Sequence, residues 1–122
     1  MPDGVPSLGP LERHVMEILW ECPDDLSTRD VLERTGQPLA YTTIATVLTN
    51  LTRKGLAEKI AVGRSWAYRP LLGRSEYTAG LMTQTLATSG DRHSSLLHFL
   101  GSMSEDDVAV LRSLLTDDGA TT

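Results

Sequence analysis

The sequence predicts a mostly α-helical protein with a small β-hairpin, arranged as a winged helix-turn-helix followed by a three-helix domain. Three segments within residues 8–53 carry apolar side chains at helical spacing. A stretch of alternating residues with a glycine turn follows them at once, which indicates a hairpin. Three more helical patterns occupy the rest of the chain. We therefore expect one domain at residues 1–72 and a second at residues 73–122.

The first two predicted helices cover residues 8–20 and 27–34. Pro10 suits the first turn of the first helix, where a missing backbone N–H costs no hydrogen bond. The second helix is short and begins with a capping-box pattern, in which Ser27 precedes Asp30 by three residues. A brief turn containing glycine leads to the third helix, which is the spacing of a helix-turn-helix.

The third predicted helix ends near Arg53 and has two faces. Threonine is a mediocre helix former, and Glu or Lys would serve a merely solvated face better. Short hydroxyl side chains suit the floor of a DNA groove. Periodicity alone leaves both interpretations open, a groove-contacting face or a solvated one. The apolar face holds Ile44, Val47, Leu48 and Leu51, and the other holds Thr42, Thr46, Thr49 and Arg53, with Thr43 and Asn50 beside them.

The predicted hairpin pairs residues 57–62 with residues 66–69. Its turn, Gly63-Arg64-Ser65, places Arg64 at the tip. Trp66 and Tyr68 share one face of the second strand by the alternation of side chains. An arginine at a tip can simply be solvated, or it can reach a phosphate or the minor groove of DNA. The position behind a threonine-faced helix favours the second interpretation.

Charge is distributed unevenly along a chain whose net charge is −5. Residues 1–39 carry three basic and eight acidic side chains, and residues 76–122 carry two and seven. Residues 40–75 carry six basic side chains and one acidic, a local net charge of +5. A phosphate backbone interacts with the local electrostatic field of the protein surface, and the average charge of the chain does not describe that field. The basic segment coincides with the third helix and the hairpin.

The three helical patterns after residue 72 are short and apolar. They lack the material for a stable core of their own, so we expect them to associate with a second copy of the chain. The residues expected at this dimer interface are Tyr77, Leu81, Leu86, Leu96, Leu97, Phe99, Leu100, Val108, Leu111, Leu114 and Leu115.

Several classes of function lack their motifs. The single cysteine, Cys22, excludes an internal disulfide and a site of clustered thiolates. No phosphate-binding glycine loop, zinc motif or nucleophile elbow is present. We expect no enzyme, no metal and no cofactor. Without a long apolar run or a leader pattern, we expect a cytosolic protein that does not insert into a membrane.

Motifs along most of the chain resemble the penicillinase repressors of the BlaI/MecI type. The resemblance begins with Leu8-Gly9-Pro10-Leu11-Glu12 and continues through Thr28-Arg29-Asp30-Val31 and Tyr41-Thr42-Thr43-Ile44. It is most specific at Leu51-x-x-Lys54-Gly55-Leu56 and the following Gly63-Arg64 and Tyr68-Arg69-Pro70. It spans residues 8 to 115 and is stronger over the first 70 residues.

The resemblance implies a homodimeric repressor whose winged helices sit on the two halves of a palindromic operator. Three C-terminal helices would form the dimerisation domain. Carried onto this sequence, the resemblance assigns base contacts to Thr42, Thr43 and Thr46, phosphate contacts to Arg53, Lys54 and Arg64, and support of the wing to Trp66 and Tyr68.

The same resemblance implies a route of induction. Such repressors are inactivated by cleavage within the dimerisation domain when a membrane sensor linked to a protease detects a β-lactam. The matching position here is His98-Phe99, and family members often carry Asn where this chain carries His98. Relatives that sense copper through cysteine clusters are excluded by the single cysteine.

The sequence also allows two alternative functions. The acidic flanks favour a winged helix that binds a protein and has no operator. A repressor released by a small ligand would need an apolar pocket between its domains.

Overall fold

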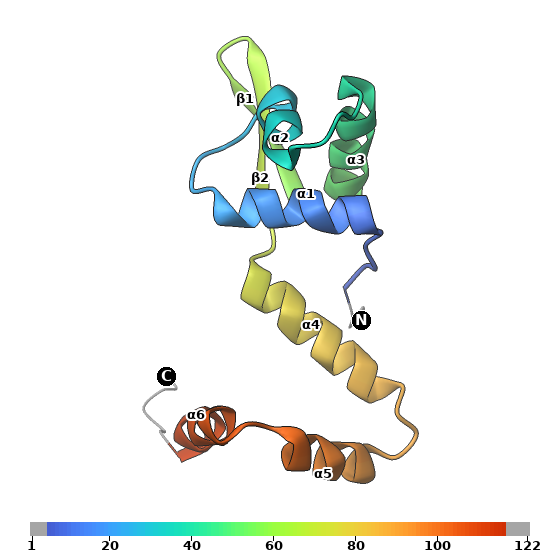
Figure 1. Cartoon of the computed structure of the whole chain (residues 1–122), viewed down its shortest axis with the longest axis vertical. Helices are drawn as coiled ribbons and strands as arrows, with labels where there is room; N and C mark the ends of the chain where they lie inside the picture. The colour runs from blue at the N-terminus through green and yellow to red at the C-terminus, as the bar shows by residue number, and fades with distance from the viewer. Residues whose placement is uncertain (1–4, 117–122) are drawn as a thin grey trace. The chain divides into compact units, whose positions relative to one another are not determined.

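The computed structural model describes residues 5–116, in two compact units of which one reaches Thr83 and the other begins at Gln84 (Figure 1). The predicted fold class, mostly helical with one small hairpin, is confirmed. The elements in chain order are α1 (Pro10–Glu21), α2 (Thr28–Thr35), α3 (Tyr41–Arg53), β1 (Ala57–Val62), β2 (Ser65–Pro70), α4 (Arg74–Ala87), α5 (Arg92–Ser102) and α6 (Glu105–Thr116).

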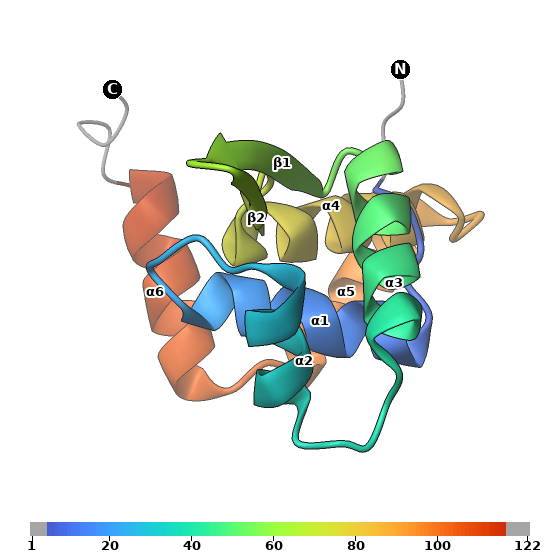
Figure 2. The ribbon, with the colours of Figure 1, turned by 90° about the horizontal axis from the view of Figure 1, so that it is seen from above.

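In the N-terminal unit α1 packs against α2, α3 and β2, and α3 packs against β1 (Figures 1 and 2). Each helix contributes one apolar face because its apolar residues recur at helical spacing. Burial of these faces removes apolar surface from water and stabilises the unit. The fully buried side chains include Val15, Met16, Leu19, Val31, Ile44, Leu48, Leu51 and Leu56.

The capping box predicted at the start of α2 is present. Ser27 Oγ accepts a hydrogen bond from the Asp30 backbone N–H at 3.1 Å, and Asp30 Oδ2 accepts one from the Ser27 N–H at 3.0 Å. Gly36 ends the helix with a φ of 66°, which a residue with a Cβ rarely adopts. The sequence therefore sets both ends of α2 locally.

The hairpin is antiparallel and pairs Ala57 with Pro70 at its base and Val62 with Ser65 at its end. The predicted three-residue turn is wrong, because Ser65 belongs to β2 and only Gly63 and Arg64 connect the strands. Gly63 has a φ of 62°, as tight two-residue hairpins require at their first turn position.

A short bridge ties the hairpin to the segment before α2. The backbone N–H of Leu26 donates to the carbonyl of Tyr68 at 3.0 Å, and the N–H of Tyr68 donates to the carbonyl of Leu26 at 2.7 Å. Leu26 thus acts as a one-residue third strand. The bridge sets the N-terminal end of α2 beside β2.

The first turns of α4 belong to the N-terminal unit. Trp20 Nε1 donates to the carbonyl of Leu72 at 2.9 Å, and the Trp20 and Tyr77 rings lie 5.7 Å apart. Tyr77 is buried, and its hydroxyl donates to the carbonyl of Pro6 at 3.2 Å. The compact unit therefore includes residues 73–83, beyond the boundary expected after residue 72.

The second unit contains the end of α4, α5 and α6, and none of residues 84–116 is buried. Asp91 caps α5 by accepting from the Ser94 N–H at 3.0 Å, and Ser104 caps α6 by accepting from the Asp107 N–H at 3.0 Å. Capping hydrogen bonds and intrinsic helix propensity favour these helices. Packing within one chain does not bury their side chains. Among residues 5–116, no helix has the length and apolar character needed to cross a membrane.

Candidate nucleic-acid interface

Helix α3 divides into the two faces expected from its periodicity. Its apolar residues from Ile44 to Leu51 are buried, which fixes the rotation of the helix against the core. The opposite face is free of packing and presents hydroxyl groups along its length. The exposed residues are Thr42, Thr43, Thr46, Thr49 and Arg53.

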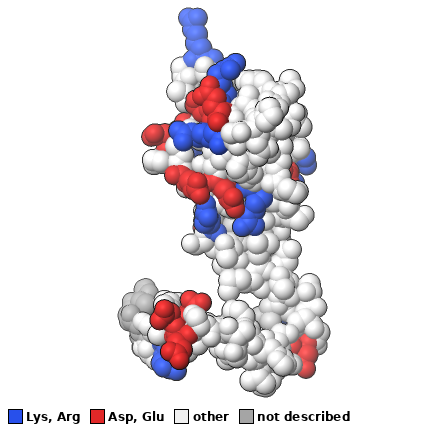
Figure 3. Space-filling model, in the orientation of Figure 1, with Lys and Arg blue, Asp and Glu red and all other residues white. Residues whose placement is uncertain are grey.

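Arg64 is a basic side chain of this unit without an internal partner among the described residues. It is exposed at the end of the hairpin, and no described residue forms an ion pair or hydrogen bond with it. Figure 3 shows a basic side chain at the outermost end of this unit, with acidic and basic side chains mixed below it. A free cation at a protruding tip can meet a phosphate without first breaking an internal contact.

Lys54 is held inside the unit. Its Nζ lies 2.8 Å from Glu12 Oε1 and 3.0 Å from Glu12 Oε2, and it also donates to the carbonyl of Ser7 at 3.0 Å. The hydrogen bond from Lys54, followed by the one from the Gly9 N–H, lowers the pKa of Glu12. The ammonium group is thus hydrogen-bonded to α1 and to the segment before it.

Two further basic residues of the segment are also paired with carboxylates. Arg69 Nε lies 2.8 Å from Glu58 Oε2, and an Arg74 terminal nitrogen lies 3.5 Å from Glu21 Oε2. Arg53 instead donates to Asn50 Oδ1 at 2.7 Å and stays exposed. Within the described chain, Arg53, Lys59 and Arg64 are the members of the basic segment without a carboxylate partner.

Lys59 and Arg29 are residues that sequence reasoning missed. Lys59 Nζ lies 4.7 Å above the centre of the Trp66 ring, and the Arg29 guanidinium lies 5.8 Å from the centre of the Tyr41 ring. Both cations thus stand against aromatic faces on the side of the unit that bears α3 and the hairpin. Aromatic residues interleaved with Arg and Lys were the available signal.

Trp66 and Tyr68 differ in exposure although they share a face of β2. Tyr68 is buried beside α2, whereas Trp66 is more than half exposed. The Tyr68 ring therefore belongs to the framework that supports the hairpin, and the Trp66 ring is available to a partner.

The residues expected at a dimer interface fall into two groups. Tyr77 and Leu81 pack against the core of the N-terminal unit. The others lie in the second unit, where Leu86, Val108 and Leu111 are half-buried. The exposed members are Leu96, Leu97, Phe99, Leu100, Leu114 and Leu115.

The candidate cleavage position, His98-Phe99, lies within α5 and is exposed. Among residues 5–116, no three His, Cys, Asp or Glu side chains come together as a metal site.

A polar helix face beside a hairpin with a free arginine, mounted on a helix-turn-helix, defines a winged-helix DNA-binding protein. Residues 8–117 match the family described as penicillinase repressor. The transcriptional regulator BlaI of Mycobacterium tuberculosis is 40% identical over 115 residues, which are 90% of this chain and 83% of that protein. The chain belongs to the penicillinase repressor family, and it is a transcriptional repressor rather than an enzyme.

Solved structures with the same fold include two regulators. BlaI of Bacillus licheniformis, solved as a monomeric form in complex with the blaP half-operator, is 27% identical with a TM-score of 0.51. The match covers 60% of this chain and 90% of that one. PcaV of Streptomyces coelicolor, solved with its natural ligand, is 25% identical with a TM-score of 0.51, and the match covers 93% of this chain and 76% of that one.

Proposed function

We propose that two copies of this repressor bind a palindromic operator in double-stranded DNA, with one winged helix on each half-site. The observation that carries the proposal is the exposed threonine face of α3 beside a hairpin with a free Arg64. The B. licheniformis BlaI structure, which holds a half-operator, supports one winged helix per half-site.

The side chains divide into base contacts and backbone contacts. Threonine hydroxyl and methyl groups on α3 would meet base edges in the major groove. Arg53 and Arg64 would meet phosphates, and Arg64 can also enter the adjacent minor groove. Lys54 has a different role, because its ammonium group already binds Glu12. The proposed base-contacting residues are Thr42, Thr43 and Thr46.

The dimer would form through the second unit. Its helices α5 and α6 bury no residue within one chain, although they carry large apolar side chains. Leu97, Leu114 and Leu115 are each at least 60% exposed. A second copy of the chain would cover these side chains and remove their apolar surface from water. Tyr77 is left out of this interface, because its ring is already buried in the N-terminal unit.

Repression would end when a sensor-linked protease in the cytoplasm cuts the bond between His98 and Phe99. A protease needs an extended backbone, so α5 must unwind locally before the bond can enter an active site. In a chain separated from its partner α5 has no buried residues, so it unwinds there at low cost. Cutting α5 would remove apolar contacts between the two copies, and β-lactam resistance genes are the proposed targets of the repressor.

One experiment tests the core of the proposal. Fragments of genomic DNA that the full chain retains near physiological salt are selected and sequenced, and the recovered duplex is compared with a random duplex in a mobility shift. We expect a palindromic sequence that is retained in preference to the random duplex. If no duplex is retained, the protein-interaction hypothesis replaces operator binding.

A further inference from the structure

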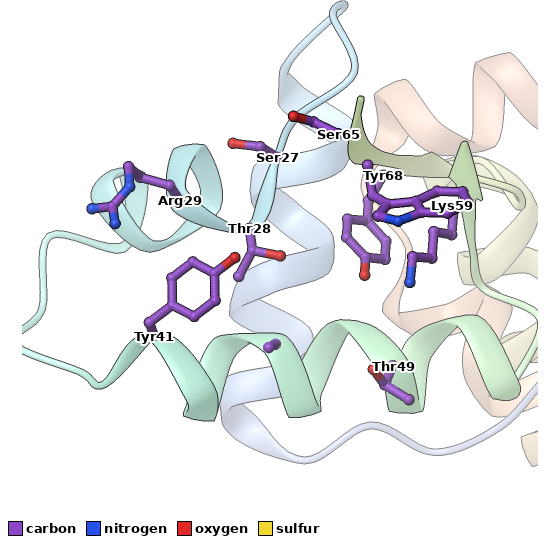
Figure 4. A pocket seen from close by; sticks show the side chains of 10 residues that line it. Ser27, Thr28, Arg29, Tyr41, Thr49, Lys59, Ser65 and Tyr68 are labelled. Atoms are coloured by element: carbon purple, nitrogen blue, oxygen red, sulfur yellow. The ribbon is translucent and has the colours of Figure 1, made fainter. Parts of the chain in front are cut away.

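A hollow of about 620 Å³ opens between the start of α2, the side of α3 and the hairpin (Figure 4). Its walls are polar and aromatic, and no Asp or Glu is among the residues that line it. Neither the expected base contacts nor the expected phosphate contacts account for it. The lining residues used below are Thr28, Arg29, Thr49, Lys59, Trp66 and Tyr68.

Two hydroxyl groups face this hollow without a protein partner. Thr28 is 8% exposed and Tyr68 is 5% exposed, yet neither hydroxyl forms a hydrogen bond within the described chain. Both oxygen atoms nevertheless keep access to solvent, since the sealed atom without a partner is His14 Nε2. Two nearly buried side chains thus each present a hydroxyl without a protein partner to the same hollow, where a bound anion can accept from both.

The backbone holds these two groups in place. The paired hydrogen bonds between Leu26 and Tyr68 set β2 beside the first turn of α2. Thr28 is the first residue of that helix, directly after the cap at Ser27. The positions of both hydroxyls thus follow from rigid backbone contacts, which favour preorganised binding.

The electrostatics of the hollow favour an anion. Arg29 and Lys59 line it, and both stand against aromatic rings rather than carboxylates. The partial positive charge at the start of α2 adds to theirs. The Asp30 carboxylate, in the same first turn, accepts from the Ser27 N–H and belongs to the cap.

The position of the hollow identifies the source of the anion. Thr49 lines it and continues the exposed face of α3, and Lys59 and Trp66 line it from the hairpin. If α3 enters the major groove and the hairpin tip reaches the neighbouring minor groove, one sugar-phosphate strand must cross between them. That strand would run over this hollow.

We propose that the hollow binds one backbone phosphate of the operator in each half-site, with Thr28 and Tyr68 donating hydrogen bonds and Lys59 and Arg29 supplying charge. The inference rests on the proposed function and adds a specific phosphate site to it. Phosphate oxygens accept from hydroxyl and cationic donors, which are the groups that the hollow provides.

The test combines protein variants with DNA that lacks one phosphate charge. Operator duplexes carrying a single methylphosphonate linkage, moved one position at a time along each strand, are titrated with the wild-type chain. The position over the hollow should lower the affinity about tenfold, as the loss of a charge-assisted hydrogen bond does, and the phosphates met by Arg53 and Arg64 should give losses of their own. Tyr68→Phe and Thr28→Val should each lower the affinity for the unmodified duplex by a similar factor.

The decisive result is the coupling between the two changes. At the position over the hollow, the methylphosphonate should cost Tyr68→Phe and Lys59→Met much less than it costs the wild-type chain, because each variant has already lost a group that interacts with that phosphate. Tyr77→Phe removes a hydroxyl outside the hollow and should keep the full wild-type loss. Thermal melting of each variant confirms that it is folded.

The outcomes separate the two proposals. If the operator is bound and every variant shows the wild-type methylphosphonate pattern, the hollow holds no phosphate, and operator binding stands. If the wild-type chain binds no duplex, both proposals fall.

Discussion

The ammonium group of Lys54 and the carboxylate of Glu12 form a paired contact between the C-terminal end of α3 and the first turn of α1. Nζ lies 2.8 Å from Oε1 and 3.0 Å from Oε2, and the two side chains are only 26% and 16% exposed. Helix α3 is thereby tied to helix α1, against which it packs. We therefore propose that Lys54 positions α3.

Lys54→Met should weaken operator binding without changing its salt dependence. The free energy of unfolding should fall by about 1–3 kcal/mol, because Glu12 loses a charge-assisted partner in a partly buried position. Arg64→Ala is the matched comparison, since it should leave stability within about 0.5 kcal/mol. Arg64→Ala should also reduce the slope of log affinity against log salt by about 0.9 for one lost phosphate contact.

Anisotropy titrations at four salt concentrations, with chemical denaturation of each variant, check both expectations. A reduced salt slope in Lys54→Met would show that this ammonium group reaches a phosphate, and it would contradict the positioning role.

Glu12 should make stability depend on pH in acid. Its pKa is lowered from the ordinary value of 4.5, chiefly by the Lys54 hydrogen bond. A group whose pKa is lower in the folded state adds stability above its unfolded pKa, and this stability is lost as the pH falls through the folded pKa. Glu12→Gln should therefore be less stable than the wild type near pH 7, with the difference shrinking below pH 4.5.

Urea unfolding of both proteins across this pH range measures the effect. Glu105→Gln, a change in an exposed carboxylate on α6, is the control for the loss of one charge. A constant difference between Glu12→Gln and wild type at all pH values would exclude the linkage.

The position of Tyr77 predicts where the chain can be shortened. A fragment of residues 1–83 keeps this ring, which is buried in the N-terminal core, whereas a fragment of residues 1–70 loses it. The shorter fragment also loses the Leu72 carbonyl that accepts from Trp20. We expect it to be less stable by about 3–5 kcal/mol, as when a large buried aromatic side chain is removed.

Thermal and urea unfolding of the two fragments provide the measurement, and sedimentation should show that the longer fragment is a monomer. Equal stability of the two would mean that Tyr77 contributes little to the unit.

Local signals made parts of the fold predictable from the sequence. The two faces of α3 follow from the spacing of Ile44, Val47 and Leu48, and the start of α2 follows from Ser27 and Asp30 three residues apart. Each signal lies within a few residues, where chain geometry decides which side chains meet.

Contacts between residues far apart in the sequence could not be predicted from such local signals. Lys54 meets a carboxylate 42 positions earlier, and its place in the basic segment does not reveal this contact. Tyr77 meets the carbonyl of Pro6, 71 positions away, and its helical spacing alone suggested an interface between two copies. The hollow between α2, α3 and the hairpin likewise depends on the bridge between Leu26 and Tyr68. Tertiary packing decides such roles, and periodicity does not report it.

Leu114→Glu should separate the proposed dimer while each chain stays folded. Leu114 is 65% exposed on α6, so the change removes no buried contact within one chain. In a dimer the same position would carry an unpaired charge into an apolar interface, which is strongly unfavourable. The variant should therefore sediment as a monomer. Its operator affinity should fall by at least about a hundredfold, since the second half-site is no longer bound at high effective concentration.

Ser113→Glu, an exposed neighbour on the same helix, introduces the same charge and should leave the sedimentation and the affinity unchanged. Binding to a duplex with one half-site separates the effect on association from any effect on the winged helix, because both variants should bind it as the wild-type chain does. A Leu114→Glu chain that still sediments as a dimer would place the interface elsewhere, because a buried charge at its centre could not be tolerated.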